Sequence, residues 1–298
     1  MERTNKSTDK SGRLPPWLKV SLRGAGPRNE VRTLLRELQL NTVCESAHCP
    51  NLCECWRRRT ATIMILGNVC SRDCRFCAVP HGIPEPPDPG EADRVVEAAS
   101  KLGLKYVVLT SVTRDDLPDG GAGHFARVTR ALREYDPKVG VEVLTPDFFG
   151  RRRDIETVIQ AAPNVFNHNV ETCARLTPQI RSGADYGRSL AVLGVAAELG
   201  SAHKIKTKSG LMLGLGETDC EIRETLIDLR ERGVSFVTLG QYLPPSSKHW
   251  PVARYVHPDE FEKWRRIAEN ELGFDVVASG PLVRSSYHAE EALRTALH

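Results

Sequence analysis

Six of the nine cysteines lie within residues 44–77 and form two triplets with different internal spacing. The first triplet reads C-x4-C-x5-C and the second reads C-x3-C-x2-C, and their members are Cys44, Cys49 and Cys55, followed by Cys70, Cys74 and Cys77. A cubane iron–sulfur cluster takes one protein ligand on each iron, usually four cysteines in all. A triplet therefore leaves one iron open, and that open position is where chemistry can take place.

Other uses of clustered thiols fit this pattern less well. Structural zinc takes four ligands, commonly from C-x2-C pairs, and neither triplet has that spacing, although His48 or His81 is available as a further ligand. A disulfide framework is disfavoured because nine is an odd number and a 298-residue chain buries a core without cross-links. Cys53, Cys173 and Cys220 fall outside both spacings and are interpreted as bystanders. Iron–sulfur chemistry in a reducing cytoplasm is the favoured interpretation.

The second triplet, with Phe76 before its last cysteine, resembles the cluster loop of the radical S-adenosylmethionine (SAM) enzymes. In that superfamily SAM chelates the fourth iron through its amino and carboxylate groups. An electron from the cluster then cleaves SAM to a 5′-deoxyadenosyl radical, so the protein supplies binding and orientation. The apolar run 62–66 ends in Gly67-Asn68 just before Cys70, as expected for a barrel strand whose C-terminal end carries the active site.

Strand and helix signals alternate along the rest of the chain, which predicts a parallel sheet wrapped by helices. Helices are expected at 91–102, ending at Gly103, after a capping box of Thr218 and Glu221, and at 259–272. Strands are expected at 62–66, 106–109, 141–144, 165–169, within 205–213, and at 236–239, with an extra strand at 274–278. The predicted α/β fold is a partial (β/α)6 TIM-type barrel with N- and C-terminal extensions.

Together, the two triplets resemble the lipoyl synthase family. The likeness runs from about Pro15 to Ala289 and rests on segments in the family's order, among them PPWLKV at 15–20, TVCE at 42–45, CPN at 49–51, SVTRDDL at 111–117, HNVET at 168–172, TKSGLMLGLGE at 207–217, QYL at 241–243 and RSSYHA at 284–289. The family inserts two sulfur atoms at C6 and C8 of an octanoyl chain held in amide linkage on a lysine of a lipoyl carrier domain.

This resemblance implies two [4Fe–4S] clusters with different duties. Cys70, Cys74 and Cys77 would hold the SAM-binding cluster, and Cys44, Cys49 and Cys55 an auxiliary cluster whose sulfides are donated. A serine of the R-S-S-Y motif would be the fourth auxiliary ligand, and Ser286 is favoured over Ser285. Serine oxygen is a harder and poorer partner for iron than thiolate, which suits a cluster that must come apart.

Residues at the strand ends are expected to contact SAM. The candidates are Thr110, Ser111, Asn169, Glu171 and Lys208, with Lys206 as the alternative lysine. Thr113 departs from the family, which usually has an acidic residue there, and this puts the local contact in question.

The resemblance divides the chain into a disordered tail at 1–13, an extension carrying the auxiliary ligands at 14–61, the radical SAM partial barrel at 62–272, and a C-terminal extension with the R-S-S-Y motif at 273–298. A formal charge of +3 is too small to imply nucleic acid. No run approaches the roughly 18 apolar residues of a membrane helix, and the N-terminus lacks the apolar core of a secretory signal.

The implied partners are octanoylated lipoyl carrier domains, either of a 2-oxoacid dehydrogenase E2 or of the glycine cleavage H protein. An electron donor of ferredoxin or flavodoxin type and a cluster-repair factor are implied as well. The arginine runs 57–59 and 151–153 are candidates for steering an acidic carrier, although a solvated charged face explains them equally well.

Two other functions compete at this point. A two-cluster electron-transfer protein would explain the cysteines, but such carriers close both clusters with four thiolates. Another radical SAM sulfur-inserting enzyme is the second alternative, but methylthiotransferases carry an RNA-binding appendage that is not seen after the barrel. Biotin synthase lacks an N-terminal second triplet.

Overall fold

The computed structural model describes residues 14–19, 26–46, 49, 51–287 and 289–291. The predicted disordered tail at 1–13 and the alternative zinc ligand His48 lie outside these residues. The elements, in order, are η1 (Pro16–Leu18), α1 (Gly26–Glu37), α2 (Val43–Ser46), α3 (Leu52–Arg57), β1 (Thr60–Ile65), α4 (Glu91–Leu102), β2 (Tyr106–Ser111), α5 (Ala122–Tyr135), β3 (Gly140–Leu144), η2 (Phe148–Gly150), α6 (Arg152–Ile159), β4 (Val165–Asn167), α7 (Thr177–Ile180), α8 (Tyr186–Ser201), β5 (Lys206–Leu213), α9 (Asp219–Glu231), β6 (Phe236–Gln241), α10 (Pro258–Arg266), η3 (Ile267–Glu271) and β7 (Val276–Gly280).

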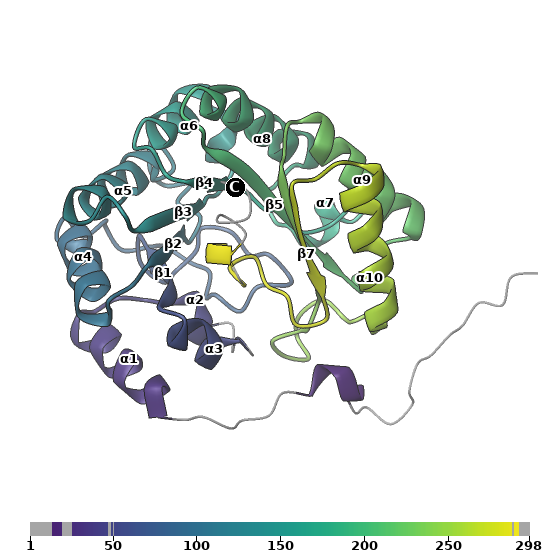
Figure 1. Cartoon of the computed structure of the whole chain (residues 1–298), viewed down its shortest axis with the longest axis horizontal. Coiled ribbons are helices and arrows are strands. Elements are labelled where there is room, and N and C mark those ends of the chain that lie inside the picture. The colour runs from purple at the N-terminus through teal and green to yellow at the C-terminus, as the bar shows by residue number, and fades with distance from the viewer. Residues whose placement is uncertain (1–13, 20–25, 47–48, 50, 288, 292–298) are drawn as a thin grey trace, which may run out of the picture.

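The described strands form one parallel sheet of seven in the order β1 to β7. Figure 1 shows the strands as an incomplete ring with the larger helices around its outside. Each βα crossover returns the chain to the same end of the sheet, so all carboxyl ends of the strands meet on one face. The predicted partial TIM-type barrel is confirmed, and the extra strand expected at 274–278 is β7, which pairs with β6.

Local sequence signals explain several element boundaries. The helix predicted at 91–102 is α4, and Gly103 ends it with φ 56°, a left-handed conformation that glycine adopts without strain. The predicted capping box is present, because the Thr218 side chain accepts from the Glu221 N–H while the Glu221 carboxylate accepts from the Thr218 N–H.

The helix expected at 259–272 changes its winding before it ends. It is α-helical only as α10, to Arg266, and continues as the π-helix η3 from Ile267 to Glu271. The N–H of Leu272 donates to the carbonyl of Ile267 at 3.1 Å, five residues back, instead of four. One face of the helix remains apolar, and Phe261, Trp264 and Ala268 are buried.

Apolar packing lies on both sides of the strands. Outside the ring, β-branched side chains such as Ile63 and Val107 pack under the helices that cover the sheet. Inside it, Tyr106, Val108, Val165 and Phe236 form an apolar cluster with Ala289 from the C-terminal segment. In Figure 1 this segment, drawn in yellow, turns back from β7 into the centre of the ring.

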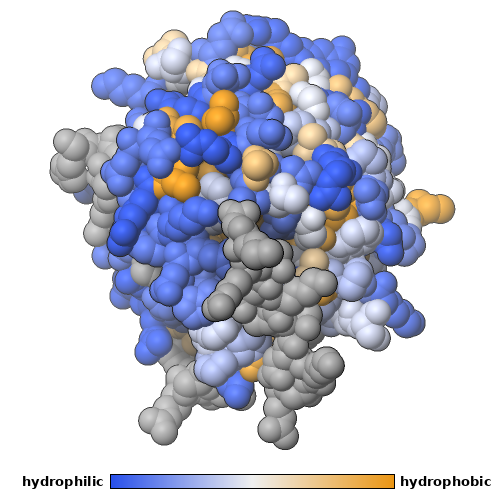
Figure 2. All heavy atoms as spheres, turned by 90° about the vertical axis from the view of Figure 1, so that its right-hand side faces the viewer, coloured by the Kyte–Doolittle hydropathy of each residue, from blue (hydrophilic) through white to orange (hydrophobic). Residues whose placement is uncertain are grey.

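The outer surface is mainly hydrophilic on the side that includes α9 and α10. Figure 2 shows apolar residues there as small separate spots among hydrophilic ones. Within the described residues, no helix is long and apolar enough to cross a membrane.

Candidate active site

The loop from Cys70 to Cys77 follows β1 and is closed at its base by backbone hydrogen bonds. The N–H of Cys70 donates to the carbonyl of Pro80 at 2.8 Å, and the N–H of Gly82 donates back to the carbonyl of Cys70 at 2.9 Å. The Cys70 sulfur accepts from the N–H groups of Arg72 at 3.4 Å and Thr113 at 3.3 Å. Backbone N–H groups aimed at sulfur stabilise thiolates and tune iron–sulfur clusters, so this loop suits cluster ligands.

The thiols of the second triplet influence one another. Burial raises the pKa of Cys74 to about 11, against the opposing charge of Arg181, and the neighbouring Cys77 and Cys70 raise it further. Burial also raises the pKa of Cys77, and Cys70 adds to the effect. Three thiolates so close together repel one another, and bound iron would offset that repulsion by taking them in deprotonated form. The donor set therefore fits an iron–sulfur cluster.

The first triplet is formed by α2, α3 and the segment between them. Cys44 is buried in α2, and burial raises its pKa against hydrogen bonds from the Thr42 and Thr62 side chains. Burial and the charge of Cys44 raise the pKa of Cys49 to about 11. Burial, followed by the charges of Cys44 and Cys49, raises the pKa of Cys55 to about 12. These three thiols also lie close enough to act as one set.

The R-S-S-Y motif of the C-terminal segment lies against this first triplet. The Thr62 hydroxyl of β1 donates to the Ser286 hydroxyl at 2.9 Å, and the Thr62 side chain is also close enough to the Cys44 thiol to lower its pKa. The Tyr287 hydroxyl donates to the Glu54 carboxylate of α3 at 3.2 Å. The half-buried guanidinium of Arg284 acts on Cys49, where its charge opposes the rise in the thiol pKa. The R-S-S-Y motif, which is far from the three cysteines in the sequence, thus lies beside them in the fold.

The side chains of neither triplet are close enough together to bind one metal ion between them. Among the described residues, no group of three or more His, Cys, Asp or Glu side chains could hold one metal ion. His81, one of the alternative zinc ligands, is instead exposed and pairs with Asp73 at 3.2 Å. A cubane spreads its ligands over separate irons, so it needs a wider set of thiols than one tetrahedral zinc does. None of the nine cysteines forms a disulfide bond.

Several polar atoms at the strand ends are ready for a polar ligand. Ser111 Oγ at the end of β2 and Asn169 Oδ1 after β4 are buried and have no hydrogen-bond partner among the described residues. Asn169 uses its Nδ2 to donate to Glu171 at 3.1 Å, and the Thr110 hydroxyl donates to the carbonyl of Leu144 at 3.1 Å. Buried polar atoms are normally satisfied, so these orphaned oxygens fit contacts to a bound polar group such as SAM.

Glu171 occupies a strained position in this group. Its φ is 63°, a left-handed value that non-glycine residues adopt rarely. Burial raises the pKa of Glu171, whereas the charge of Arg181 and the hydrogen bond from Asn169 oppose the rise. Strained residues of this kind are concentrated at functional sites.

Lys208 lies deeper in the barrel than the other SAM candidates. Its ammonium donates to both oxygens of Glu142, at 2.9 and 3.1 Å, and both side chains are buried. The same carboxylate accepts from Tyr106 at 3.1 Å and Asn167 at 2.8 Å. Lys206 pairs with Asp275 at 3.0 Å. The assignment of Lys208 to SAM stays a prediction.

Thr113 contributes through its backbone, which explains how the chain tolerates a departure there. Its N–H donates to Cys70 Sγ, and its carbonyl accepts from the N–H and the hydroxyl of Ser71, each at 3.0 Å. Any residue except proline supplies the same groups.

A second layer of polar residues, which sequence reasoning did not identify, supports the loop after β4. His168 Nδ1 bonds to the Thr145 carbonyl at 2.9 Å, and Nε2 bonds to the Ser189 hydroxyl at 3.0 Å. Arg181 donates to the same hydroxyl and to the Val170 carbonyl, both at 3.1 Å. The only signal in the sequence was that His168 begins the HNVET segment.

Comparison with known proteins extends these observations. A family model for the radical SAM superfamily matches residues 64–229, and one for the N-terminal domain of lipoyl synthase matches residues 1–49. The lipoyl synthase of Caldanaerobacter subterraneus subsp. tengcongensis is 54% identical over 284 residues, covering 95% of this chain and 98% of that protein. The lipoyl synthase of Rubrobacter xylanophilus is 54% identical over 277 residues, covering 93% and 85%.

Solved structures share the fold at low sequence identity. Methylornithine synthase superposes with a TM-score of 0.55 at 12% identity, covering 84% of this chain and 81% of its own. HydG, a maturase of the [FeFe]-hydrogenase, gives a TM-score of 0.56 at 15% identity, covering 88% and 74%. These likenesses support the barrel, whereas the curated relatives match over nearly the whole chain.

Proposed function

Because the chain belongs to the lipoyl synthase family of the radical SAM superfamily, we propose that it inserts two sulfur atoms, at C6 and C8, into an octanoyl group held on a lysine of a lipoyl carrier domain. When bound, one [4Fe–4S] cluster supplies the electron that cleaves SAM, and a second supplies sulfur. The observation that carries this proposal is the meeting of the R-S-S-Y motif with the first cysteine triplet at Thr62.

In this proposal Cys70, Cys74 and Cys77 hold the SAM-binding cluster and leave one iron position to SAM. The backbone N–H groups of Arg72 and Thr113 support this assignment, because they bond to the Cys70 sulfur and stabilise its charge. Ser111, Asn169 and Glu171 orient SAM at the strand ends, and the Thr110 hydroxyl joins the ends of β2 and β3 through the Leu144 carbonyl.

Cys44, Cys49, Cys55 and Ser286 hold the auxiliary cluster. Ser286 is favoured over Ser285 because its hydroxyl accepts a hydrogen bond from Thr62, whose side chain also lowers the pKa of the Cys44 thiol. The Arg284 guanidinium orients the set by attracting the Cys49 thiolate. A ligand set that combines thiolates with one hard oxygen leaves one iron less tightly held, as the release of sulfide requires.

The partners follow from this reaction. The substrate is an octanoylated lipoyl domain, of a 2-oxoacid dehydrogenase E2 or of the glycine cleavage H protein. A ferredoxin- or flavodoxin-type donor supplies electrons, and a cluster-repair factor restores the auxiliary cluster. Of the two arginine runs, 151–153 follows β3 at the same end of the barrel as the Cys70 loop, whereas 57–59 precedes β1 at the other end. The run 151–153 is therefore the better placed to meet an acidic carrier.

Mass spectrometry tests the proposed function directly. The reconstituted chain is incubated anaerobically with an octanoylated carrier domain, SAM and dithionite, and the intact carrier is weighed. The expected product carries two added sulfur atoms as a dithiol, and it loses two hydrogens only when the thiols are later oxidised to the cyclic disulfide. A carrier that keeps its octanoyl mass while SAM is cleaved would refute the proposal, and an octanoylated carrier incubated without SAM is the matched control.

A further inference from the structure

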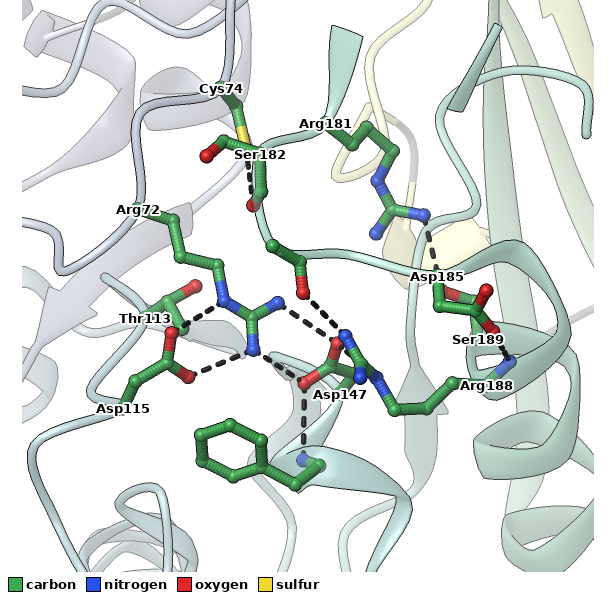
Figure 3. A network of polar contacts seen from close by, with 12 residues as sticks. Arg72, Cys74, Thr113, Asp115, Asp147, Arg181, Ser182, Asp185, Arg188 and Ser189 are labelled. Atoms are coloured by element: carbon green, nitrogen blue, oxygen red, sulfur yellow. Dashed lines mark hydrogen bonds and ion pairs between the residues drawn. The ribbon is translucent and has the colours of Figure 1, made fainter. Parts of the chain in front are cut away.

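Arg72 lies between two predicted cluster ligands, Cys70 and Cys74, but its side chain points away from the thiols and into the protein. Its side chain is only 8% exposed, and both edges of the guanidinium are engaged. Nε and Nη2 donate to the two oxygens of Asp115 at 2.7 and 2.8 Å, and Nη1 and Nη2 donate to those of Asp147, each at 2.9 Å (Figure 3). One side chain therefore joins the Cys70 loop to two other loops.

The two carboxylates come from the ends of neighbouring strands. Asp115 follows β2, and Asp147 follows β3. Asp147 is the more enclosed, with its side chain 1% exposed, and it also accepts from Arg188 Nε of α8 at 2.9 Å. Two arginines and two aspartates thus form a group without net charge, which lowers the cost of burying it.

Further hydrogen bonds, most of them from the backbone, reinforce the junction between the Cys70 loop and the loop after β2. The N–H of Ser71 donates to the carbonyl of Thr113 at 3.0 Å, and the N–H of Asp115 donates to the Ser71 hydroxyl at 3.1 Å. The N–H of Thr113 reaches the Cys70 sulfur itself. A shift of Arg72 relative to Asp115 would therefore displace the Cys70 sulfur, which is a predicted cluster ligand.

The junction with the loop after β3 is held under backbone strain. Phe148, Phe149 and Gly150 have φ values of 44°, 54° and 71°, so two non-glycine residues in a row are left-handed. Such strained residues persist only where their surroundings hold them. An Asp147 oxygen accepts from the Phe149 N–H at 3.1 Å, and the Arg72 guanidinium lies 5.7 Å from the Phe149 ring. The turn is thus fixed by the same ion pair that anchors Arg72.

We propose that Arg72 is a positioning residue of the radical SAM site: its bidentate contacts with Asp115 and Asp147 fix the Cys70–Cys77 loop against the ends of β2 and β3. The inference rests on the proposed function only in assigning the SAM-binding cluster to this loop. Lysine cannot replace Arg72. Its ammonium is a point charge and cannot make a two-bond contact with Asp115 and another with Asp147 at the same time, as the planar guanidinium does. The cluster and SAM keep their relative positions because the loop has no freedom to tilt.

The test compares Arg72→Lys with the wild type in the full, anaerobically reconstituted chain. The first measurement is the electron paramagnetic resonance (EPR) spectrum of the reduced protein as SAM is titrated. The second is the rate at which a chelator removes iron with and without SAM; the iron whose release SAM slows is that of the SAM-binding cluster, about half of the total. Arg72→Lys is expected to need roughly 10-fold more SAM for the same spectral change and to lose the SAM-protected iron roughly 10-fold faster. Iron that SAM does not protect should leave at the wild-type rate.

Arg175→Lys is the matched control. Arg175 also makes two contacts with one carboxylate, Glu221, at 2.6 and 3.0 Å, but its side chain is exposed and, among the described residues, its hydrogen bonds go to Glu221 and the Gly216 carbonyl and not to the Cys70 loop. This variant is expected to behave as wild type in both measurements. Asp115→Asn replaces Arg72→Lys if the latter does not fold, since it removes one charge from the more exposed carboxylate and should give the same changes in weaker form.

Unchanged SAM titration and unchanged iron release in Arg72→Lys would overturn the inference, even if the melting temperature fell, because Arg72 would then act on stability alone. Failure of the wild type to thiolate the carrier would refute the proposed function but leave these two measurements intact. The two proposals therefore fail separately.

Discussion

Gly240 of β6 packs directly against Val283, the residue before the R-S-S-Y motif. Replacing Gly240 with alanine tests how closely that motif must be held against the barrel. A Cβ built on Gly240 would lie 2.2 Å from the Val283 carbonyl oxygen and 3.2 Å from the Val283 carbonyl carbon. Contacts under 3.0 Å do not occur between real atoms of this kind, so something must move. Gly240 is paired with β5 on one side and β7 on the other. The strand is therefore fixed, and Val283 must move by roughly 1 Å.

The cost of Gly240→Ala follows from this displacement. Overpacking a fixed core costs about 1–3 kcal/mol. The hydrogen bond between Thr62 and Ser286, now 2.9 Å, lies three residues further along the displaced segment, and its loss adds about 1 kcal/mol. We expect the variant to be less stable by about 2–4 kcal/mol and to hold the auxiliary cluster poorly, because Ser286 moves away from Cys44.

Iron content and product are measured together to check this expectation. The wild type should hold about eight irons, from two cubanes, whereas Gly240→Ala should hold about half of them and still cleave SAM. Gly194→Ala in α8 is the control, since its added Cβ would meet only Arg232 Cδ at 3.5 Å. In that helix, alanine for glycine gives up to about 1 kcal/mol of stability. A full iron complement and wild-type lipoyl formation in Gly240→Ala would refute the reasoning.

Two further predictions concern groups that are not assigned as ligands. Burial lowers the pKa of His168 from its ordinary value of 6.5 to about 4, so the unfolded chain takes up a proton at higher pH than the folded one does. Stability is therefore lost as the pH falls from about 6.5 to 4, by about 2 kcal/mol between pH 7 and pH 5; urea unfolding should show this loss and His168→Gln should remove it. Cys53, Cys173 and Cys220, changed singly to alanine, should keep both clusters and lipoyl formation, and loss of one cluster in Cys53→Ala would show that the auxiliary ligands are assigned wrongly.

Much of the fold could be predicted from the sequence because its signals are local. Glycine at 103 and the pair Thr218 and Glu221 mark helix ends by their own chemistry, and the structure has both features. The strand before Cys70 was expected at 62–66 and is present as Thr60–Ile65, with Leu66 left-handed at φ 66°. The π-helical end of the helix after Pro258 was missed, because one wider turn leaves the apolar face of the sequence unchanged.

Residues of the site could be predicted from the sequence alone only where their spacing along the chain indicated a shared ligand. The cysteine triplets are close in sequence, so their grouping was visible, and the R-S-S-Y motif was placed beside the first triplet only by family resemblance. The partners of Arg72 lie 43 and 75 residues further along the chain, and no local pattern connects them. Likewise, nothing in the sequence indicated that Lys208 would pair with Glu142 from β3, which depends on β3 and β5 lying on either side of β4. The division of the chain at 61/62 and 272/273 stays a prediction.

The central claim is that the two cysteine triplets have separate duties, and two single variants test it most directly. Cys74→Ala and Cys49→Ala are compared with wild type in one anaerobic reaction that records 5′-deoxyadenosine and thiolated carrier together. Cys74→Ala should form neither product, because the SAM-binding cluster is lost. Cys49→Ala should still form 5′-deoxyadenosine but no thiolated carrier. Lipoyl product at the wild-type level from Cys49→Ala would contradict the account, because the first triplet would then not hold the source of sulfur.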